Sequence, residues 1–469
     1  MVDYNQQEEV TLFLQGIERE YAVDTWTLGG IHIWPFVKVS LYFYIFGLRK
    51  DTNLISLPEC SKPSSRPSQT KGLLHKTLFR ITHPLKFKKF LSTLPEKDIL
   101  FYSHSTYRTL HKGKQFNKFF DTLIEEEFSE QRNQIAFIED FYNYNPADLA
   151  HSDLIVDVRQ AFNYFLTTAT QRTPPKLEGA DYQEFIDHLD EGFALFKSQF
   201  STENFFSFFS TIYYKSLFFE AILKKINPKQ LYITCYYCNS SFPLIIAAKK
   251  LGIEVIEMQH GVMDTHHIPY GFWTKTPPNG YEMMPDVIWN WDIISAQLIQ
   301  ENFKNTPVKP MVKGNPWVDY LKKEKIEGLD AQYILYSLQP FLENEMLFPP
   351  EMIKAINELP YVWYLRLHPR QVLDQPMLID YLKSQGTNMA KINFDLATEA
   401  YLPPLLEHAK LHITQYSSCV IEAALLNKKT WLIYADAQLY FKEYIKAGMA
   451  EYVDPDQLFN KLSKITTYD

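Results

Sequence analysis

The chain has 469 residues, of which 46% are hydrophobic and 22% are charged, so its composition is that of a folded protein and excludes large-scale disorder. This length exceeds what one hydrophobic core usually organises, and it predicts two domains. The net charge of −8 excludes a general nucleic-acid binder, which needs a basic surface to displace counterions.

Cysteine usage and the N-terminal region favour a cytoplasmic location. Four cysteines in so long a chain do not make a disulfide framework. Cys235 and Cys238 form a C-x-x-C pair, for which unreactive thiols are the favoured interpretation and a redox or metal role the alternative. The polar, acidic N-terminus argues against a secretory signal. The apolar stretch 31–48 contains Lys38, and it predicts a buried aromatic-rich helix rather than a membrane span.

The segment 60–95 carries the strongest charge asymmetry. It contains no Asp or Glu and eight basic residues, namely Lys62, Arg66, Lys71, Lys76, Arg80, Lys86, Lys88 and Lys89. Its first part has a loop-like composition, and its second part mixes the bases with apolar residues. A solvated basic face on a helical insertion is the favoured interpretation, and contact with an anionic membrane through Lys62 to Lys89 is the alternative.

Apolar runs and turn residues predict alternating strands and helices along the chain. In the N-terminal half we expect mainly helices over 1–95, a strand over 98–103, a helix over 116–128, a strand over 134–140, a Phe-rich helical insertion over 150–226, a strand over 230–235, a helix over 241–251, strands over 253–258 and 285–291, a helix over 293–303 and a final strand with a turn over 309–316. In the C-terminal half we expect strands over 333–338, 362–367, 411–414 and 430–434, and helices over 350–358, 376–384 and 418–426.

This alternation predicts an α/β fold with parallel sheets and right-handed crossovers. We expect two Rossmann-like domains, an N-terminal one over 1–320 with helical insertions at 1–95 and 150–226, and a C-terminal one over 331–469. The polar segment 321–330 is the expected hinge.

Two motifs of the C-terminal half have phosphate-binding chemistry. Gln415-Tyr-Ser417-Ser418 lies at a strand-to-helix junction, where hydroxyls and free N–H groups can hold an anion, with Glu422 one turn further along the helix. A simple serine helix cap is the alternative.

The second motif, Arg366-Leu-His368-Pro-Arg370, closes another strand. Two guanidinium groups and an imidazole can neutralise a phosphate and stabilise it as a leaving group. A solvated Arg-His turn is the alternative.

The N-terminal half offers candidate bases. His260 lies between Gln259 and Gly261 after a strand, where an imidazole can accept a proton from a hydroxyl and glycine lets a ligand approach the backbone. His104, in the loop after the first strand, is the rival base or an acceptor contact. A metal site at Asp264, His266 and His267 is a weaker alternative because of their adjacency and loop setting.

Taken together, the Gln-His-Gly motif, the downstream Gly314-Asn315-Pro segment, His368-Pro-Arg and Ser417-Ser418 with Glu422 resemble bacterial GT-B glycosyltransferases of capsule and lipopolysaccharide assembly. The His-Pro and Ser-Ser motifs are similar to those of sialyl- and Kdo-transferases and of teichoic acid glycerophosphate polymerases. The resemblance covers about 98–456, without the helical insertion. The acidic pair of the sialyltransferases is not evident.

This resemblance implies two domains facing a cleft, with donor contacts from Arg366, His368, Arg370, Gln415, Ser417, Ser418 and Glu422, and with Gly314 and Asn315 lining the cleft. His260 would be the base, on the acceptor side with Gln259 and Gly261. Such enzymes need neither a metal nor another cofactor.

The expected function is a glycosyltransferase that moves a sugar from a nucleotide-sugar donor to a surface glycan or lipid-linked glycan acceptor. It would be cytoplasmic, with peripheral contact at the inner membrane as an option, and would bind no nucleic acid. The alternatives are an isomerase like the non-hydrolysing UDP-GlcNAc 2-epimerases and a non-catalytic scaffold of polysaccharide assembly.

Overall fold

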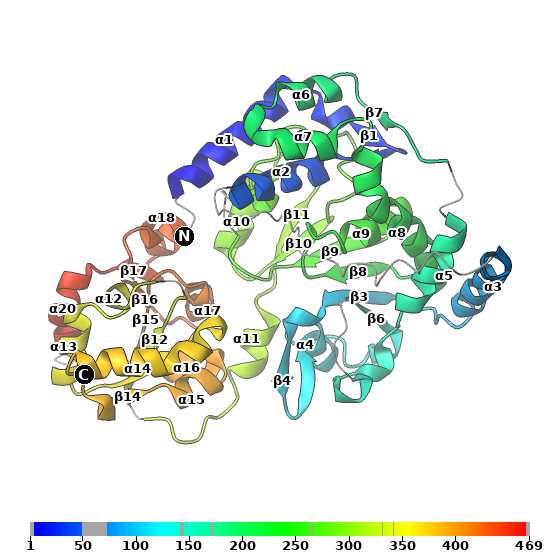
Figure 1. Ribbon diagram of the computed structural model, residues 1–469. Coiled ribbons are helices and arrows are strands. Elements are labelled where there is room, and N and C mark those ends of the chain that lie inside the picture. Colours follow the sequence, from blue (N-terminus) through cyan, green and yellow to red (C-terminus); the bar gives the residue numbers. More distant parts are fainter. Residues whose placement is uncertain are drawn as a thin grey trace. The chain divides into compact units, whose positions relative to one another are not determined.

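The computed structural model describes residues 4–48, 73–140, 145–169, 173–263, 265, 267–330, 332–340 and 342–465. Two compact units make up the chain, Asn5–Val312 and Lys313–Asp469. They divide shortly before the predicted boundary at 320 (Figure 1). Each unit contains one six-stranded, wholly parallel sheet, so the predicted α/β fold with two Rossmann-like domains is confirmed.

The N-terminal sheet has the order β11-β10-β9-β8-β3-β6. Its strands are β3 (Ile99–His104), β6 (Ile135–Asp140), β8 (Gln230–Ile233), β9 (Glu254–Met258), β10 (Val287–Asn290) and β11 (Lys309–Val312). The helices of this unit are α1 (Tyr4–Glu20), α2 (Trp34–Leu48), α3 (Leu73–Leu91), α4 (Phe120–Glu125), α5 (Arg159–Ala169), α6 (Tyr182–His188), α7 (Ala194–Phe200), α8 (Phe205–Ile226), α9 (Phe242–Lys250) and α10 (Ile293–Asn302).

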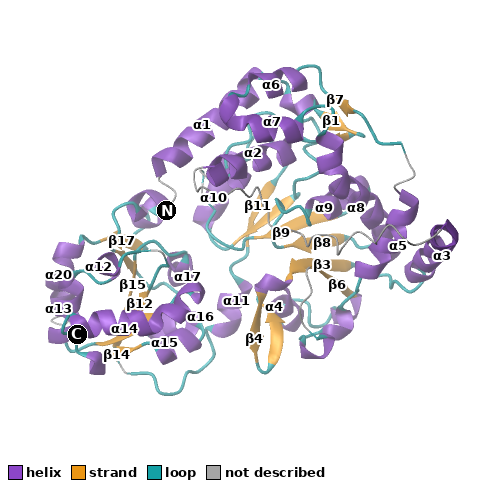
Figure 2. Ribbon diagram, viewed as in Figure 1, coloured by secondary structure: helices purple, strands orange, loops and turns teal. Residues whose placement is uncertain are grey.

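Two small antiparallel elements of this unit differ from the sequence prediction. Strands β1 (Thr27–Leu28), β2 (Ile31–His32) and β7 (Leu177–Glu178) form a three-stranded sheet within regions expected to be helical. The helix expected over 116–128 is wrong in its first part, where β5 (Lys114–Asn117) pairs with β4 (Arg108–His111) (Figure 2). Lys112 and Gly113 both have positive φ between these strands, which is the geometry of a tight hairpin turn.

A buried ion pair links α1 to α2, and its two members also form hydrogen bonds with the loop that contains Phe272 and Thr274. Lys38 of α2 donates to Glu18 of α1 at 2.6 Å and to the Phe272 carbonyl at 2.6 Å, and both charged side chains are almost fully buried. Glu18 also accepts from the backbone and side chain of Thr274. Helices α1, α2, α6 and α7 lie together at one end of this unit, as Figure 1 shows.

The C-terminal sheet has the order β14-β13-β12-β15-β16-β17. Its strands are β12 (Tyr333–Ser337), β13 (Val362–Arg366), β14 (Ile392–Asn393), β15 (Leu411–Thr414), β16 (Thr430–Leu432) and β17 (Ala450–Tyr452). Its helices are α11 (Pro316–Leu321), α12 (Asn344–Leu347), α13 (Pro350–Glu358), α14 (Gln375–Ser384), α15 (Asp395–Glu399), α16 (Leu402–His408), α17 (Cys419–Leu425), α18 (Ala437–Tyr440), α19 (Lys442–Lys446) and α20 (Leu458–Ile465).

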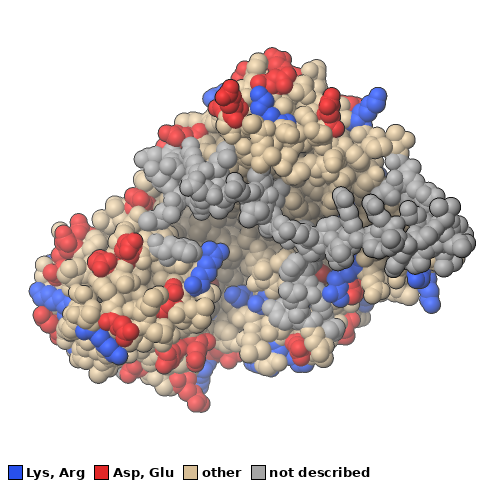
Figure 3. Space-filling model, viewed as in Figure 1, with Lys and Arg blue, Asp and Glu red and all other residues tan. Residues whose placement is uncertain are grey.

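Helices cover both faces of this sheet. Ile334 and Tyr336 of β12 belong to one hydrophobic cluster, whereas the alternating residues Tyr333 and Leu335 belong to another. All five residues of β12 are buried, as expected of a central parallel strand. On the face of this unit drawn in Figure 3, acidic and basic side chains are interspersed.

None of the described helices combines the length and the apolar character that crossing a lipid bilayer requires.

Candidate functional site

The N-terminal sheet changes its winding direction between β3 and β8. In open parallel sheets the loops at the carboxyl ends of two such strands part, and ligands bind in the crevice between them. His104 ends β3, the turn Cys235 to Cys238 follows β8, and His260 follows the adjacent β9. The fold therefore brings the two predicted bases to one sheet edge, on either side of the β8 loop.

Aromatic side chains surround His260. The Tyr237 hydroxyl lies 3.4 Å from its Nε2, and the ring centroids of Tyr107, Tyr237 and Tyr270 lie 5.9, 6.1 and 6.4 Å from the imidazole. Burial lowers the pKa of His260 to about 4, so the ring is neutral at pH 7. A neutral imidazole at a strand end can accept a proton from a bound hydroxyl.

Glu257 of β9, which belongs to none of the sequence motifs, forms hydrogen bonds with Tyr270 beside His260 and with Tyr236. Its carboxyl is fully buried and accepts at Oε1 from the Tyr270 hydroxyl at 2.6 Å and from the Tyr236 backbone N–H at 3.1 Å. Its Oε2 has no hydrogen-bond partner among the described residues. Burial raises the pKa of Glu257 to about 8, so the carboxyl is mostly protonated at pH 7. The available sequence signal was an acidic residue inside an apolar strand, two residues before the Gln259-His260-Gly261 motif.

His267 joins the same cluster from the following loop. Its ring centroid lies 5.3 Å from that of Tyr237 and 5.4 Å from that of Tyr270. Burial, and next the neighbouring His260, lower the pKa of His267 to about 4. Asp264 and His266 lie outside the described residues. Within the described part of the chain, no three His, Cys, Asp or Glu side chains are grouped to hold a metal.

His104 has a local bonding role. Its Nδ1 accepts from the Thr106 backbone N–H at 3.2 Å and lies 2.9 Å from the Thr106 hydroxyl. The loop continues into Arg108, whose buried guanidinium pairs with Glu139 at 2.7 Å and Asp121 at 3.1 Å. These contacts hold in place the segment that contains Tyr107, whose ring lies next to His260.

Gln259 and Gly261 shape the loop after β9. The Gln259 amide is fully buried, donates to the Gly261 carbonyl at 3.0 Å and to Ser295 Oγ at 3.1 Å, and accepts from the Trp291 N–H at 2.8 Å. It therefore serves the loop's structure. Gly261 has open space where a side chain would begin.

The C-terminal sheet has its own switch point between β12 and β15. Gln415, Ser417 and Ser418 follow β15, so the Ser-Ser motif lies at this crevice. The Gln371 side chain donates to the Gln339 carbonyl in the loop after β12 at 2.7 Å, which ties the His-Pro loop of β13 to the same edge.

His368 is held with its Nε2–H free of the backbone contact that its other ring nitrogen makes. Its Nδ1 accepts from the Arg370 backbone N–H at 3.1 Å, capping the short helix Pro369–Asp374. The proton of the neutral ring is therefore on Nε2. Burial, and next the charge of Arg370, lower the pKa of His368. The Arg370 side chain itself is exposed.

One nitrogen of the Arg366 guanidinium has a structural role. Its Nη1 donates to the carbonyls of Ala397 and Ala400, each at 2.6 Å, and so closes the end of α15. Burial lowers its pKa, and the charges of Cys419 and Glu422 oppose this effect. The structure thus brings Arg366 close to α17, the helix that carries Glu422.

The serine motif is partly a helix cap. Ser417 is buried, and its Oγ accepts from the Cys419 N–H at 3.3 Å, whereas Ser418 is exposed at the start of α17. Gln415 is buried and donates to the Tyr336 hydroxyl, while its Oε1 has no partner among the described residues.

Gly314 and Asn315 lie between β11 and α11. Gly314 has φ +82°, and Asn315 Oδ1 accepts from the N–H groups of Trp317 at 3.0 Å and Val318 at 3.4 Å, which makes it the cap of α11. One D-x-D triplet, Asp454-Pro-Asp456, follows β17, where Asp454 accepts from the Asp456 N–H at 3.0 Å and caps a short helical turn.

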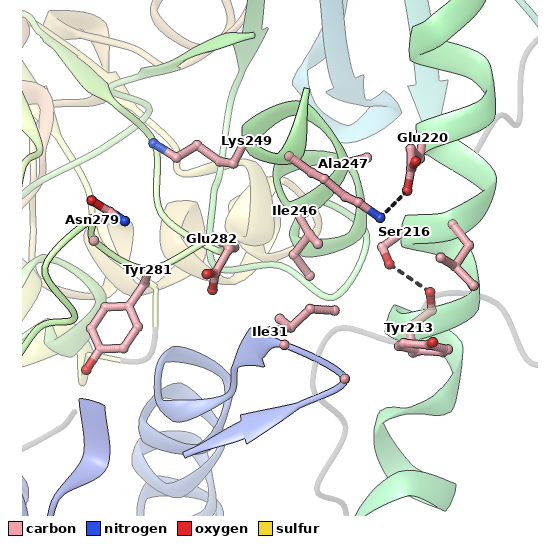
Figure 4. A pocket seen from close by; sticks show the side chains of 15 residues that line it. Ile31, Tyr213, Ser216, Glu220, Ile246, Ala247, Lys249, Asn279, Tyr281 and Glu282 are labelled. Atoms are coloured by element: carbon pink, nitrogen blue, oxygen red, sulfur yellow. Dashed lines mark hydrogen bonds and ion pairs between the residues drawn. The ribbon is translucent and has the colours of Figure 1, made fainter. Parts of the chain in front are cut away.

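A cavity of about 450 Å³ lies elsewhere in the N-terminal unit, between the β1–β2 turn, α8, the end of α9 and residues 279–282 (Figure 4). Its charged side chains are paired: Lys250 with Glu220 at 2.7 Å, Lys249 with Asp286, and Glu282 with His32 at 3.0 Å. Because α9 ends there, the cavity is near the amino edge of the sheet and apart from the histidine cluster.

The sequence matches no protein-family model and no curated protein. Among solved structures, the UDP-GlcNAc 2-epimerase of Methanocaldococcus jannaschii is 15% identical with a TM-score of 0.45, over 78% of this chain and 91% of that one. The UDP-GlcNAc 2-epimerase of Neisseria meningitidis is 12% identical with a TM-score of 0.46, over 79% and 91%. MurG of Acinetobacter baumannii is 12% identical with a TM-score of 0.40, over 79% and 90%. Likenesses this low assign neither a family nor an activity to the chain.

Proposed function

We propose that this protein is a nucleotide-sugar enzyme, and specifically a glycosyltransferase that moves a sugar from a nucleotide donor to a surface-glycan acceptor. The observation that carries the proposal is the switch point of the C-terminal sheet, where Ser417 follows β15 and the His368 loop is hydrogen-bonded to the loop after β12. The sheet order there is that of a dinucleotide-binding Rossmann domain.

In this proposal the donor phosphates bind at that edge. His368 Nε2–H, the Ser418 hydroxyl and the exposed Arg370 guanidinium would neutralise the leaving phosphate. Glu422 and Gln415 would contact the ribose or the sugar, and no resident metal is invoked.

His260 is the proposed base for the acceptor hydroxyl. Because burial holds the pKa of His260 at about 4, the imidazole is available as a base throughout the neutral range. In the proposed reaction, kcat/KM should therefore show no loss from this group between pH 8 and about pH 5. His260→Gln should lower kcat by about 100-fold or more.

An epimerase-like isomerase remains the second candidate, because a nucleotide-binding edge and a neutral base would serve either reaction. The two are separated by product analysis of nucleotide sugars incubated with the protein, with and without a glycan acceptor. Transfer predicts release of free nucleotide that depends on the acceptor. A new nucleotide-sugar isomer without acceptor would replace the transferase proposal with the isomerase, and no turnover with any donor would favour a scaffold.

We also propose that α3 contacts an anionic membrane. In its described part Lys86, Lys88, Lys89 and Leu85 are exposed. Lys62, Arg66 and Lys71 lie outside the described residues. Co-sedimentation with phosphatidylglycerol vesicles should fall for Lys88→Glu/Lys89→Glu, and an unchanged bound fraction would contradict this contact.

A further inference from the structure

Cys235 and Cys238 lie in the turn between β8 and α9, and neither is in a disulfide. Their sulfur atoms are 2.9 Å apart. Ordinary nonbonded heavy-atom contacts are about 3.5–4 Å, and an S–S bond is about 2 Å. The turn therefore holds the two thiols close enough to bond after a small movement.

The turn is fixed by backbone contacts that do not involve the sulfurs. Glu257 accepts from the Tyr236 N–H at 3.1 Å, and the Cys238 carbonyl accepts from the N–H groups of Ser241 at 2.9 Å and Phe242 at 3.1 Å. Cys235 is 6% exposed, whereas Cys238 is partly exposed. A reagent in solution therefore reaches Cys238 first, with Cys235 behind it as the second thiol.

We propose that Cys235 and Cys238 are a redox-active dithiol that a low-molecular-weight disulfide, such as oxidised glutathione, converts to an intramolecular disulfide. The Cys238 thiolate attacks one glutathione sulfur, which forms a mixed disulfide and releases one glutathione thiolate. Cys235 then attacks Cys238 Sγ and releases the second glutathione. Two protein thiols are oxidised, one glutathione disulfide is reduced, and the two thiol protons pass to the released glutathione thiolates.

The location of the pair couples it to the histidine cluster. Tyr237 lies between the two cysteines, and its hydroxyl is 3.4 Å from His260 Nε2. Its ring also packs on His267 and Tyr270. Because Tyr237 is in the loop that the disulfide would close, oxidation is expected to alter its contact with His260.

The test treats the full-length protein with oxidised glutathione, blocks remaining thiols with iodoacetamide under denaturing conditions, and maps the tryptic peptides. Residues 230–249 contain both cysteines and no internal Lys or Arg. The proposal predicts that this peptide escapes alkylation and is about 2 Da lighter than its reduced form. Cys238→Ser should abolish the product, whereas Cys419→Ser should leave it intact.

A stable glutathione adduct on this peptide, two alkylated thiols, or a bond from either cysteine to Cys60 or Cys419 would overturn the proposal. Wild-type peptide mapping gives the answer even where Cys238→Ser does not fold. None of these readouts depends on transferase activity. The coupling is tested separately by the His260 ring signal in NMR, which should shift on oxidation of the wild type; an unchanged signal would refute the coupling.

Discussion

Replacing Glu257 with Gln should remove a large pH dependence of folding stability. The carboxyl is fully buried, and burial raises its pKa from 4.5 to about 8. Below pH 4.5 the group is protonated in both states. As pH rises from 4.5 to about 8, the unfolded chain releases its proton while the folded chain keeps it, so stability falls. A difference of about 3.5 pKa units corresponds to about 5 kcal/mol in total, and to about 3 kcal/mol at pH 7.

Glu257→Gln keeps an oxygen that can accept from Tyr236 and Tyr270 but cannot ionise. Urea unfolding at pH 5 and pH 8 measures the effect, because the contributions of all other groups cancel in the difference between variant and wild type. The variant should gain several kcal/mol relative to the wild type between these two pH values. Glu254→Gln, an exposed position on the same strand, is the matched control. Equal pH slopes for Glu257→Gln and wild type would refute the argument.

Further predictions concern the N-terminal segment. Lys38→Met leaves Glu18 charged and buried without its ion-pair partner, and should lower the free energy of unfolding by about 3–5 kcal/mol. The double variant Lys38→Met/Glu18→Gln should recover part of this loss. Urea unfolding measures both changes, and a loss under about 1 kcal/mol in Lys38→Met would contradict the prediction. Gly29→Ala and Gly30→Ala each place a side chain at positive φ, at a cost of about 1–2 kcal/mol. A Cβ on Gly29 would also lie 3.1 Å from Pro175 Cβ, whereas Gly30 faces open space, so the first variant should melt at the lower temperature. Equal melting temperatures would show that this contact relaxes freely.

The central parallel strands, such as β12 and β15, were predictable because they are buried on both faces and their sequences are apolar runs. The strand expected over 411–414 and the helix expected over 350–358 agree with β15 and α13. The short hairpins were not predictable in this way. Phe116 has the spacing of a helical apolar position, but the left-handed turn at Lys112 and Gly113 places it in β5.

The candidate site was predictable where a motif follows a strand. The fold places His104 and His260 at one sheet edge, and His368 and Ser417 at another. The contacts that Glu257 makes with Tyr270, and Tyr107 with His260, could not be predicted, because they depend on how loops distant in sequence pack. Nor could the sequence show that the side chains of Arg366 and Gln259 form hydrogen bonds that stabilise neighbouring loops and helix ends.

The central claim, that the carboxyl edge of the C-terminal sheet binds a nucleotide, is tested most directly by thermal stabilisation with UDP, GDP, CMP, CDP and dTDP. A nucleotide at 100 times its Kd should stabilise the wild type by about 2.7 kcal/mol. His368→Ala and His368→Asn should both lose this shift, although Asn can still cap the helix at Pro369. His408→Ala, at the exposed end of α16 near the opposite sheet edge, should keep it. Stabilisation by no nucleotide, or a shift unchanged in both His368 variants, would contradict the account.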